Sequence, residues 1–358
     1  MALAFALSAF VLAPVSAHAA APPTTTYLAL GDSISFGYSE ERFNLHFPTE
    51  SPSYFEEGFT NDFVKDLAKN SEVGKSIRLV NDACPGETSE GLIGENPEVG
   101  GEASTETLEE VEGKPAERFP AGGYQGIGDY HPCKYTFENH LPLHNGGYLN
   151  GGKEVSQLEE AISSIESKTS PVQAITLNIG SNDLLAGVTQ CEDEHITEGE
   201  AVILKCIFER GEKIVAPKIV SDLADTIGVI DHVGYKGPIV LLGFYNPNAF
   251  VLPKSDLAVE ALNKAIETEL LPGLAEEGIT NVAYANPFSV FNAGAPTTSS
   301  EGNGKAELKA ICKFTEMCNP NDPGGKSDDG DIHPSPTGYK ELGKLVNKAY
   351  LELVAKGV

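Results

Sequence analysis

The segment Tyr27-Leu28-Ala29-Leu30-Gly31-Asp32-Ser33-Ile34 joins an apolar run to a polar turn. Residues 27–30 are apolar without a break, which predicts a short strand. Gly31 and Asp32 are turn residues and end that strand. Ser33, whose hydroxyl can serve as a nucleophile, therefore follows directly on the end of a strand. A serine in such a pattern more commonly caps the next helix. The rest of the sequence is therefore needed to choose between a helix cap and a nucleophile.

Four further apolar runs follow along the chain, and segments with helical spacing separate them. The five predicted strands are residues 27–30, 77–80, 172–179, 238–244 and 281–285. Between them, apolar residues recur at spacings of three and four, as in Leu158, Ile162 and Ile165, which predicts amphipathic helices. A last helix begins at Ser335-Pro336, and its apolar stripe runs to Val354. This alternation predicts an α/β fold with a five-stranded parallel sheet and helices on both faces.

Two segments interrupt the alternation. Residues 87–150 are rich in Gly, Glu and Pro and show little periodicity, which predicts a long loop insertion. Residues 186–212 contain Cys191 and Cys206 and are interpreted as an excursion held by a disulfide. The sequence shows no internal repeat and no interdomain linker, so we expect residues 24–358 to form one domain.

The composition narrows the class of protein. The 358 residues include 25 Lys and Arg against 52 Asp and Glu, which gives a formal net charge of −27. A surface this acidic repels phosphate backbones and anionic membrane faces, which argues against a nucleic-acid partner. Apolar residues make up 41% of the chain, enough for a sizeable core and too many for wholesale disorder.

The first twenty residues form the longest apolar run of the chain. They contain Ala17-His18-Ala19, a small-x-small pattern typical of cleavage sites, so residues 1–19 are interpreted as a secretory signal peptide. No Lys or Arg precedes Arg42, which leaves a buried N-terminal helix as the alternative. No later stretch is apolar enough to span a membrane, so we expect a secreted protein without stable membrane insertion. The even count of six cysteines agrees with an oxidising compartment.

Three more predicted turns carry residues suited to chemistry. Gly86 follows the second strand, where a glycine lets backbone N–H groups approach a ligand closely. Asn182 follows the third strand, and its amide can donate to a developing oxyanion. His333 precedes the last helix, with acidic residues two and four positions before it, and can act as a base. Taken alone, each has an ordinary explanation as a turn residue or an exposed side chain.

Taken together, these turns resemble the blocks of the GDSL or SGNH hydrolase superfamily, in the same order. Gly31-Asp32-Ser33-Ile34 is similar to the first block, with Ile34 where the family has Leu, and Gly86 corresponds to the second. Gly180-x-Asn182-Asp183 is similar to the third block and His333 to the last. The resemblance implies a three-layer αβα, flavodoxin-like fold and a secreted serine esterase or lipase without cofactor or metal.

The resemblance also implies roles for single residues. Ser33 would be the nucleophile, and His333 the general base and then the general acid. The backbone N–H groups of Ser33 and Gly86, with the side chain of Asn182, would form the oxyanion hole. The reaction would pass through an acyl-enzyme intermediate. These residue types belong together because a serine hydroxyl is a poor nucleophile near neutral pH until a base takes its proton.

The acid of the expected triad is where this sequence departs from the family. The family has an Asp three residues before the His, and here that residue is Gly330. Asp331 and Asp329 lie on either side of it, and a backbone carbonyl is a third candidate to orient the ring. In an extended chain both lie on the same side as His333, so a small change of turn brings either carboxylate to the ring; of the three candidates we favour Asp331.

The cysteines are expected to pair in sequence order. Six cysteines allow 15 pairings, so the sequence alone does not determine the connectivity and the pairing below is a prediction. The predicted disulfides are Cys84–Cys133, Cys191–Cys206 and Cys312–Cys318. Each pair closes a short loop and holds a segment without periodicity of its own. The first would also steady the loop that contains Gly86.

Other functions have weaker support in the sequence. His140 and His144 have the spacing of a metal pair, but no HExxH pattern surrounds them. The acidic run 328–331 lacks the register of a calcium loop. A polysaccharide O-deacetylase on the same fold is the alternative to an esterase acting on small-molecule or lipid esters, and a non-catalytic secreted binding protein is the third possibility. A monomer is expected.

Overall fold

The computed structural model describes residues 25–46, 52–70, 76–93, 149–150, 153–154, 156–167, 170–250, 252, 255–295, 304–319 and 330–358. The predicted signal peptide lies outside these residues, as does most of the predicted insertion. Asp329, Cys133, His140 and His144 also lie outside them.

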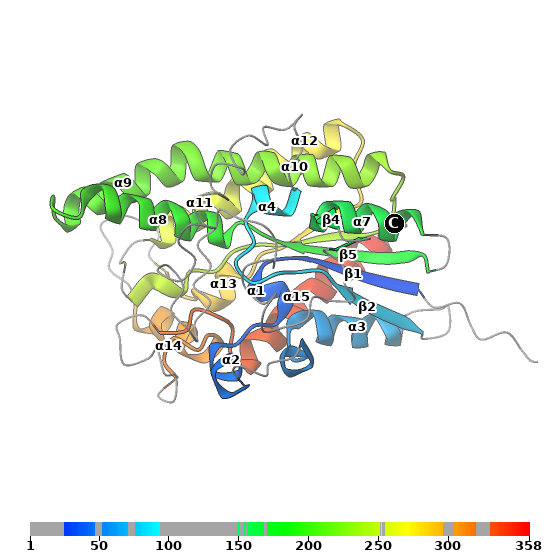
Figure 1. Ribbon diagram of the computed structural model, residues 1–358, viewed down its shortest axis with the longest axis horizontal. Helices are drawn as coiled ribbons and strands as arrows, with labels where there is room; N and C mark the ends of the chain where they lie inside the picture. The colour runs from blue at the N-terminus through cyan, green and yellow to red at the C-terminus, as the bar shows by residue number, and fades with distance from the viewer. Residues whose placement is uncertain are drawn as a thin grey trace, which may run out of the picture.

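A parallel sheet forms the centre of the molecule (Figure 1). From edge to edge its strands are β2 (Ile77–Asn81), β1 (Thr25–Gly31), β5 (Val172–Asn178), β6 (Ile239–Leu242) and β7 (Val282–Ala285). Every neighbouring pair is parallel. In chain order the sheet reads second, first, third, fourth, fifth, which is the flavodoxin-like arrangement. The α/β class and all five predicted strands are confirmed, with ends that shift by at most two residues.

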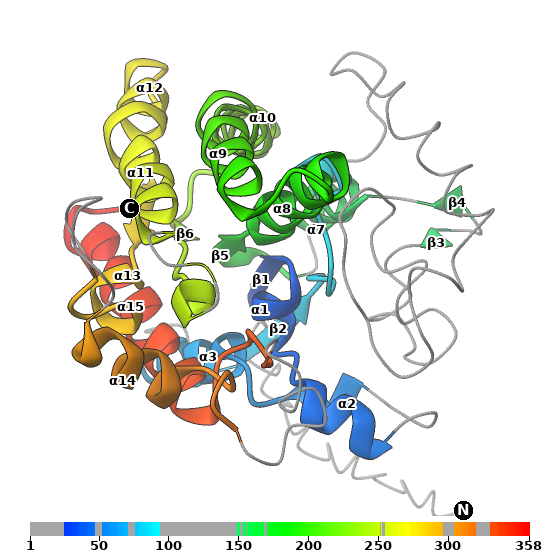
Figure 2. The same ribbon diagram turned by 90° about the vertical axis from the view of Figure 1, so that its left-hand side faces the viewer.

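Helices cover both faces of the sheet and produce three layers (Figure 2). Along β1, Leu28 and Leu30 point to one face, and Tyr27 and Ala29 point to the other. The first face packs against α4 (Ser89–Ile93), α7 (Gln157–Glu166), α10 (Ala216–His232), α11 (Asp256–Ala265) and α12 (Leu271–Glu276). The second packs against α3 (Phe59–Asn70), α13 (Phe288–Phe291), α14 (Lys305–Phe314) and α15 (Pro336–Ala355). Burial on both faces explains why β1 is an apolar run without alternation.

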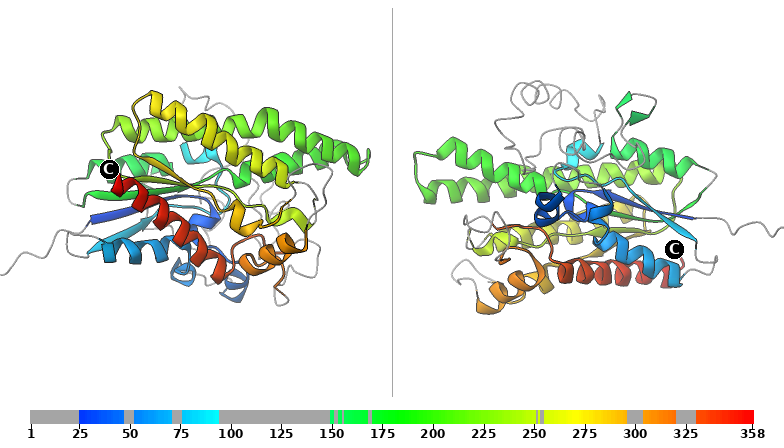
Figure 3. Two further views of the ribbon diagram at one scale, coloured as in Figure 1. Left: turned by 180° about the vertical axis from the view of Figure 1, so that it is seen from behind. Right: turned by 60° about the horizontal axis from the view of Figure 1, so that its bottom comes forward.

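The last helix, α15, begins as the sequence predicts. Ser335 is its N-cap and accepts a hydrogen bond from the N–H of Gly338 at 3.1 Å. The helix lies beside α3 beneath the sheet (Figure 3). There the ring of Tyr350 packs edge-on against Phe63, with 5.5 Å between ring centres. This packing fixes the segment that carries His333 to the second face of the sheet.

Short elements complete the described chain. They are α1 (Ser33–Phe36), α2 (Glu40–His46), the 3₁₀ turns Pro52–Phe55 and Pro247–Phe250, and the π-helical turn η5 (Ile266–Leu270). The strands β3 (Leu149–Asn150) and β4 (Lys153–Glu154) form a separate antiparallel pair. The predicted insertion begins with structure rather than loop, because Leu92 and Ile93 of α4 are buried in the core. The insertion itself stays a prediction.

Residues 186–212 lie in a helical hairpin that the sequence did not predict. α8 (Ser181–His195) packs along α9 (Glu200–Arg210), which continues through the π-helical turn η3 (Gly211–Val215) into α10 (Figure 1). In α8 the buried residues are Asn182, Gly187 and Cys191, and no described side chain of α9 is buried. Because these helices bury so little apolar surface, the stripe that signals a helix in the sequence is weak here.

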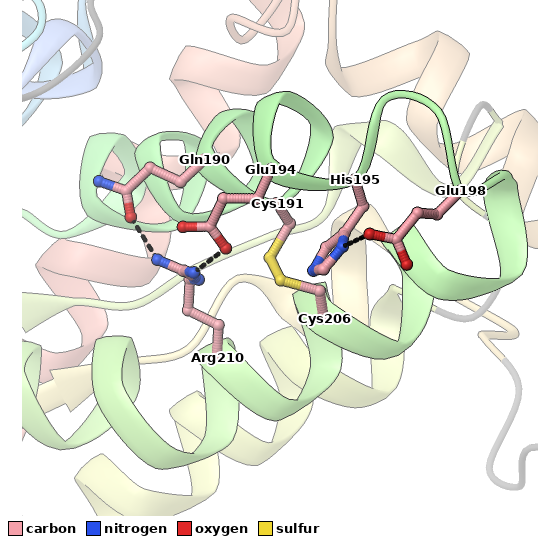
Figure 4. Close-up of a disulfide and its surroundings, with 7 residues drawn as sticks. All are labelled: Gln190, Cys191, Glu194, His195, Glu198, Cys206 and Arg210. Carbon is pink, nitrogen blue, oxygen red and sulfur yellow. Dashed lines mark hydrogen bonds and ion pairs between the residues drawn. A yellow bond between two sulfur atoms is a disulfide. The ribbon is translucent and has the colours of Figure 1, made fainter.

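The predicted disulfide Cys191–Cys206 joins the two helices of this hairpin (Figure 4). Arg210 on α9 reaches back to α8 and donates to Glu194 at 2.6 Å. Glu194, His195 and Cys206 offer ligand atoms within 4.8 Å of one another. The sulfur of Cys206 is already bonded to Cys191, so this group does not make a metal site.

Two features concern the expected compartment. The second predicted disulfide, Cys312–Cys318, is also present, at the end of α14. The pair Cys84–Cys133 stays a prediction, because Cys133 lies outside the described residues. Within the ranges given above, no helix is both long enough and apolar enough to cross a membrane.

The strand order reverses at β1, which has β2 on one side and β5 on the other. In open parallel sheets, ligands bind at the carboxyl ends of the strands where the order reverses. Ser33 follows β1, Gly86 follows β2 and Asn182 follows β5. The fold therefore brings these three segments to one edge of the sheet.

Candidate active site

Ser33 is the first residue of α1, a single helical turn directly after β1. Gly31 makes this turn possible: its φ is +134°, and a Cβ there would clash with the carbonyl oxygen of Asn178. Asp32 caps the turn by accepting from the N–H of Ile34 at 2.9 Å. Burial raises the pKa of Asp32 to about 7, against the opposing effect of that N–H. Ser33 is thus held at the rim of the sheet by its neighbours in sequence.

His333 lies between Ser33 and Asp331. Its Nε2 is 2.9 Å from the Oγ of Ser33, although the two residues are 300 positions apart. Its Nδ1 is 2.5 Å from Oδ1 of Asp331, which also accepts the backbone N–H of His333 at 2.9 Å. The other oxygen of Asp331 accepts from the N–H of Glu40 at 3.1 Å, so both oxygens are engaged. The three side chains form one continuous chain of hydrogen bonds.

The charges of this pair support each other. Burial tends to raise the pKa of Asp331, but the neighbouring His333 and the hydrogen bonds outweigh it and hold that pKa below its usual value. Burial tends to lower the pKa of His333, but the carboxylate of Asp331 and the charges of Asp32 and Glu40 together outweigh it and raise that pKa. A carboxylate at Nδ1 favours the tautomer with its proton there, which leaves the lone pair of Nε2 facing Ser33. The arrangement can therefore remove a proton from the hydroxyl.

Gly330 explains the departure of this sequence from the family's pattern. A Cβ at Gly330 would lie 2.5 Å from the carbonyl oxygen of Met317, so this position has no room for an aspartate. Met317 belongs to the loop that the disulfide Cys312–Cys318 closes. The acid beside the ring is therefore found one residue later, at Asp331. The alternative Asp329 lies outside the described residues.

The loop after β2 carries the other predicted residue of the oxyanion hole. Gly86 adopts a φ of +84° in a turn, a conformation that favours glycine. Main-chain bonds hold the start of this loop to β1, among them one from the N–H of Cys84 to the carbonyl of Gly31 at 2.9 Å. The carbonyl of Glu87, directly after Gly86, accepts from Nδ2 of Asn182 at 2.8 Å. An amide nitrogen carries two hydrogens, so Asn182 keeps a second donor for a ligand.

Gln157 supports this region and was not among the predicted site residues. It is fully buried and exchanges two hydrogen bonds with the backbone of Gly31, at 2.8 and 2.9 Å. Its amide also donates to the side chain of Glu87 at 3.0 Å. Gln157 thus ties the end of β1 to the oxyanion loop. Gln157 precedes the stripe of Leu158, Ile162 and Ile165 and does not belong to it, so the sequence carried no local signal for this role.

Asp183 supports the same region and has a place in the third block, but no role was predicted for it. It accepts from the N–H of Ser89 at 3.0 Å and from the hydroxyl of Ser89 at 2.6 Å. Burial raises the pKa of Asp183, and the hydrogen bonds from Ser89 oppose this. The same hydroxyl also contacts Asp222 on α10 at 2.6 Å. These contacts join the start of α4, which follows the loop of Gly86, to the start of α8, which carries Asn182.

Comparison with solved structures gives distant matches along nearly the whole chain. An extracellular lipase from Streptomyces rimosus is 16% identical, with 93% of this chain and 100% of that chain covered and a TM-score of 0.41. A lipase from a goat rumen metagenome is 14% identical, with 91% and 97% covered and a TM-score of 0.42. A mutant form of an acetyl-xylooligosaccharide esterase from a Geobacillus is 14% identical, with 92% and 94% covered and a TM-score of 0.39.

Comparison with sequences is more decisive. No curated protein matches the chain at a significant level. The family model described as "GDSL-like Lipase/Acylhydrolase" matches residues 27–346, which include every residue of the Ser33–His333–Asp331 chain as well as Gly86 and Asn182. Because this match spans most of the sequence, from the first strand into the last helix, the chain belongs to the GDSL-like lipase/acylhydrolase family.

Proposed function

We propose that the protein is an exported serine esterase that cleaves carboxylic esters of small molecules or lipids through an acyl-enzyme, and that it acts as a monomer. The observation that carries the proposal is the continuous chain of hydrogen bonds from Ser33 Oγ through the ring of His333 to Asp331. Export rests on the leader sequence 1–19 and agrees with the two disulfides.

In the first half-reaction, Oγ of Ser33 attacks the ester carbonyl while its proton passes to Nε2 of His333. The carboxylate of Asp331 stabilises the imidazolium that forms. The carbonyl oxygen becomes an oxyanion, and the N–H groups of Ser33 and Gly86 and Nδ2 of Asn182 are its proposed donors. As the alcohol leaves, it takes the proton from Nε2, and Ser33 remains acylated.

In the second half-reaction, water replaces the alcohol. His333 takes a proton from the water, whose oxygen attacks the acyl carbon, and a second oxyanion forms in the same place. When this intermediate collapses, Ser33 leaves as the alkoxide and receives the proton from Nε2. The products are one alcohol and one carboxylic acid for each ester and water consumed, so no cofactor takes part in the balance.

The test combines turnover with active-site labelling. Purified protein should hydrolyse a short p-nitrophenyl ester and react with a fluorophosphonate probe. Ser33→Ala should lose both activities while its thermal unfolding changes little, because Ser33 lies at the rim. Ser181→Ala, which changes the nearest other candidate serine in the third block, should still be labelled. Full labelling of Ser33→Ala would contradict the proposal.

A substrate panel separates the ester classes. Short and long acyl p-nitrophenyl esters are compared with acetylated xylan, at equal enzyme and matched pH. We expect kcat/KM to be higher for the p-nitrophenyl and lipid-like esters. Release of acetate from the polysaccharide at a higher kcat/KM would instead assign the O-deacetylase activity.

A further inference from the structure

The segment that follows β6 is held in place by two asparagine side chains. Asn263 donates to the carbonyl of Phe244 at 2.8 Å and accepts from its N–H at 2.9 Å. Asn292 does the same for Asn246, at 2.8 and 2.9 Å. Each side-chain amide thus makes the two hydrogen bonds that a neighbouring strand would otherwise make with the backbone of that residue. The residue between these two clamped positions is Tyr245.

The second clamp is itself anchored in a buried polar cluster. Asn292 donates to Asp256 and to Glu307, each at 3.3 Å, and Asn246 donates to Asp256 at 2.8 Å. All four side chains are at most 3% exposed. These hydrogen bonds hold the side chains of Asn246 and Asn292 in place, so the cluster limits the movement of the backbone around Tyr245.

The side chain of Tyr245 connects this frame to the catalytic loop. Its ring is buried and stacks on Phe291, with 4.6 Å between ring centres and 27° between the planes. Its hydroxyl donates to the carbonyl of Ile332 at 2.9 Å. Ile332 stands between Asp331 and His333 in the chain. Burial, followed by the charges of Asp331 and Asp32, raises the pKa of Tyr245 well above its usual value, so the hydroxyl stays protonated and remains a donor.

The carbonyls of Ile332 and His333 are held from two different elements. The carbonyl of His333 accepts from the N–H of Glu316 at 2.9 Å, in the loop after α14. The carbonyl of Ile332 accepts from Tyr245. The peptide groups before and after the Cα of His333 are thus each held by a hydrogen bond, so neither rotates freely. Rotation of the first would turn the ring of His333 away from Ser33.

We propose that Tyr245 is a positioning residue for ester hydrolysis: its hydroxyl fixes the Ile332 carbonyl and thereby aims Nε2 of His333 at Ser33. This proposal rests on the function proposed above. Tyr245 touches neither substrate nor reacting atoms in this scheme, and it acts through the backbone of the catalytic loop.

The test removes the hydroxyl of Tyr245. Tyr245→Phe keeps the stacking on Phe291 and removes only the hydrogen bond to Ile332. We expect kcat for a short p-nitrophenyl ester to fall about tenfold, with KM changed less than twofold, because the loss affects the reacting groups and not the binding of substrate. The rate of fluorophosphonate labelling should fall by a similar factor, since labelling also needs an activated Ser33.

Tyr235→Phe is the matched control. Tyr235 is also buried, and its hydroxyl donates to a backbone carbonyl, that of Pro238, at 3.1 Å. This contact lies at the opposite end of β6, before the strand begins. Both variants should lose a similar amount of thermal stability, and only Tyr245→Phe should lose kcat. Equal loss of kcat in both variants, or kcat within twofold of wild type in Tyr245→Phe, would overturn the proposal.

A second readout is independent of ester turnover. In ¹⁵N-histidine spectra, the ring signals of His333 are assigned by their loss in His333→Gln. Tyr245→Phe should change the Nδ1 signal and the pKa of His333, and Tyr235→Phe should not. A wild-type protein that hydrolyses no ester would contradict the proposed function alone, whereas an unchanged His333 spectrum in Tyr245→Phe would contradict the role of Tyr245 alone.

Discussion

The two sides of the site are built in different ways. Ser33, Gly86 and Asn182 come directly after neighbouring strands, so the pairing of β2, β1 and β5 brings them to one edge. In the described part of the chain, no strand leads directly to His333. Its loop is held by contacts from Glu40, Tyr245 and Glu316, which belong to three separate parts of the chain. The proposed nucleophile is therefore positioned by the sheet, and the proposed base is positioned by side-chain and loop contacts over long sequence distances.

The largest expected effect comes from Asp331, at the centre of the histidine side. Asp331→Asn should lower kcat by ~10³–10⁴, because the amide favours the wrong tautomer of His333. The charge of Asp331 also raises the pKa of His333, so its removal should move the acid limb of the kcat/KM profile to lower pH. Asp231→Asn, which breaks only an exposed pair with Lys236, is the control and should retain full activity. A fall below tenfold would mean that the backbone orients the ring.

The nucleophile side is tested at Asn182. Asn182→Ala should lower kcat by ~10²–10³ with little change in KM, because the lost donor acts mainly on charge that develops in the transition state. Asn281→Ala is the matched control: its amide also donates to a carbonyl, that of Gly237 at 2.7 Å, at the far end of the sheet. If the two variants lose activity equally, Asn182 is a structural residue only.

The two confirmed disulfides offer a smaller and more selective test. Replacing Cys312 and Cys318 together by Ala should loosen the loop that contacts the backbone of His333, and kcat should fall about three- to tenfold. Replacing Cys191 and Cys206 together should lower thermal stability and leave kcat within twofold, because Cys191 lies more than two helical turns beyond Asn182 along α8. Equal kcat values in the two double variants would show that the histidine loop does not depend on its disulfide.

The smallest expected effect concerns the stability of the fold and not its activity, and it comes from Asp82, a buried residue after β2. Burial, with a further contribution from Glu160, raises the pKa of Asp82 to about 7, against the effect of Arg78. The folded state therefore binds this proton more tightly than the unfolded state, so stability should fall as pH rises from about 4 to 7. In Asp82→Asn, the free energy of unfolding should fall less over this pH range, by on the order of 1 kcal/mol or more. Urea unfolding at several pH values measures this difference. Asp66→Asn on the surface of α3 should leave the slope unchanged.

The sequence was sufficient for the side of the site that the sheet builds. Each strand that leads to Ser33, Gly86 or Asn182 is a mainly apolar segment that ends in turn residues, and both signals are local. The positions of Tyr245 and Gln157 were not predictable, because the partners Ile332 and Gly31 lie 87 and 126 residues away. The acid was only narrowed to three candidates, since the reason for Gly330 is the carbonyl of Met317, which approaches it through folding. The hairpin of α8 and α9 was missed because it buries few side chains.

The separation of 300 residues between Ser33 and His333 has a consequence for biosynthesis. Ser33 is made 300 residues before His333, so a growing chain carries this serine without its proposed base over that whole interval. β1 must likewise wait for β5, and such distant pairings slow folding. Hydrolytic competence should therefore arise as the final event of folding, after α15 has docked. A chain that ends before residue 333 should be inert toward esters.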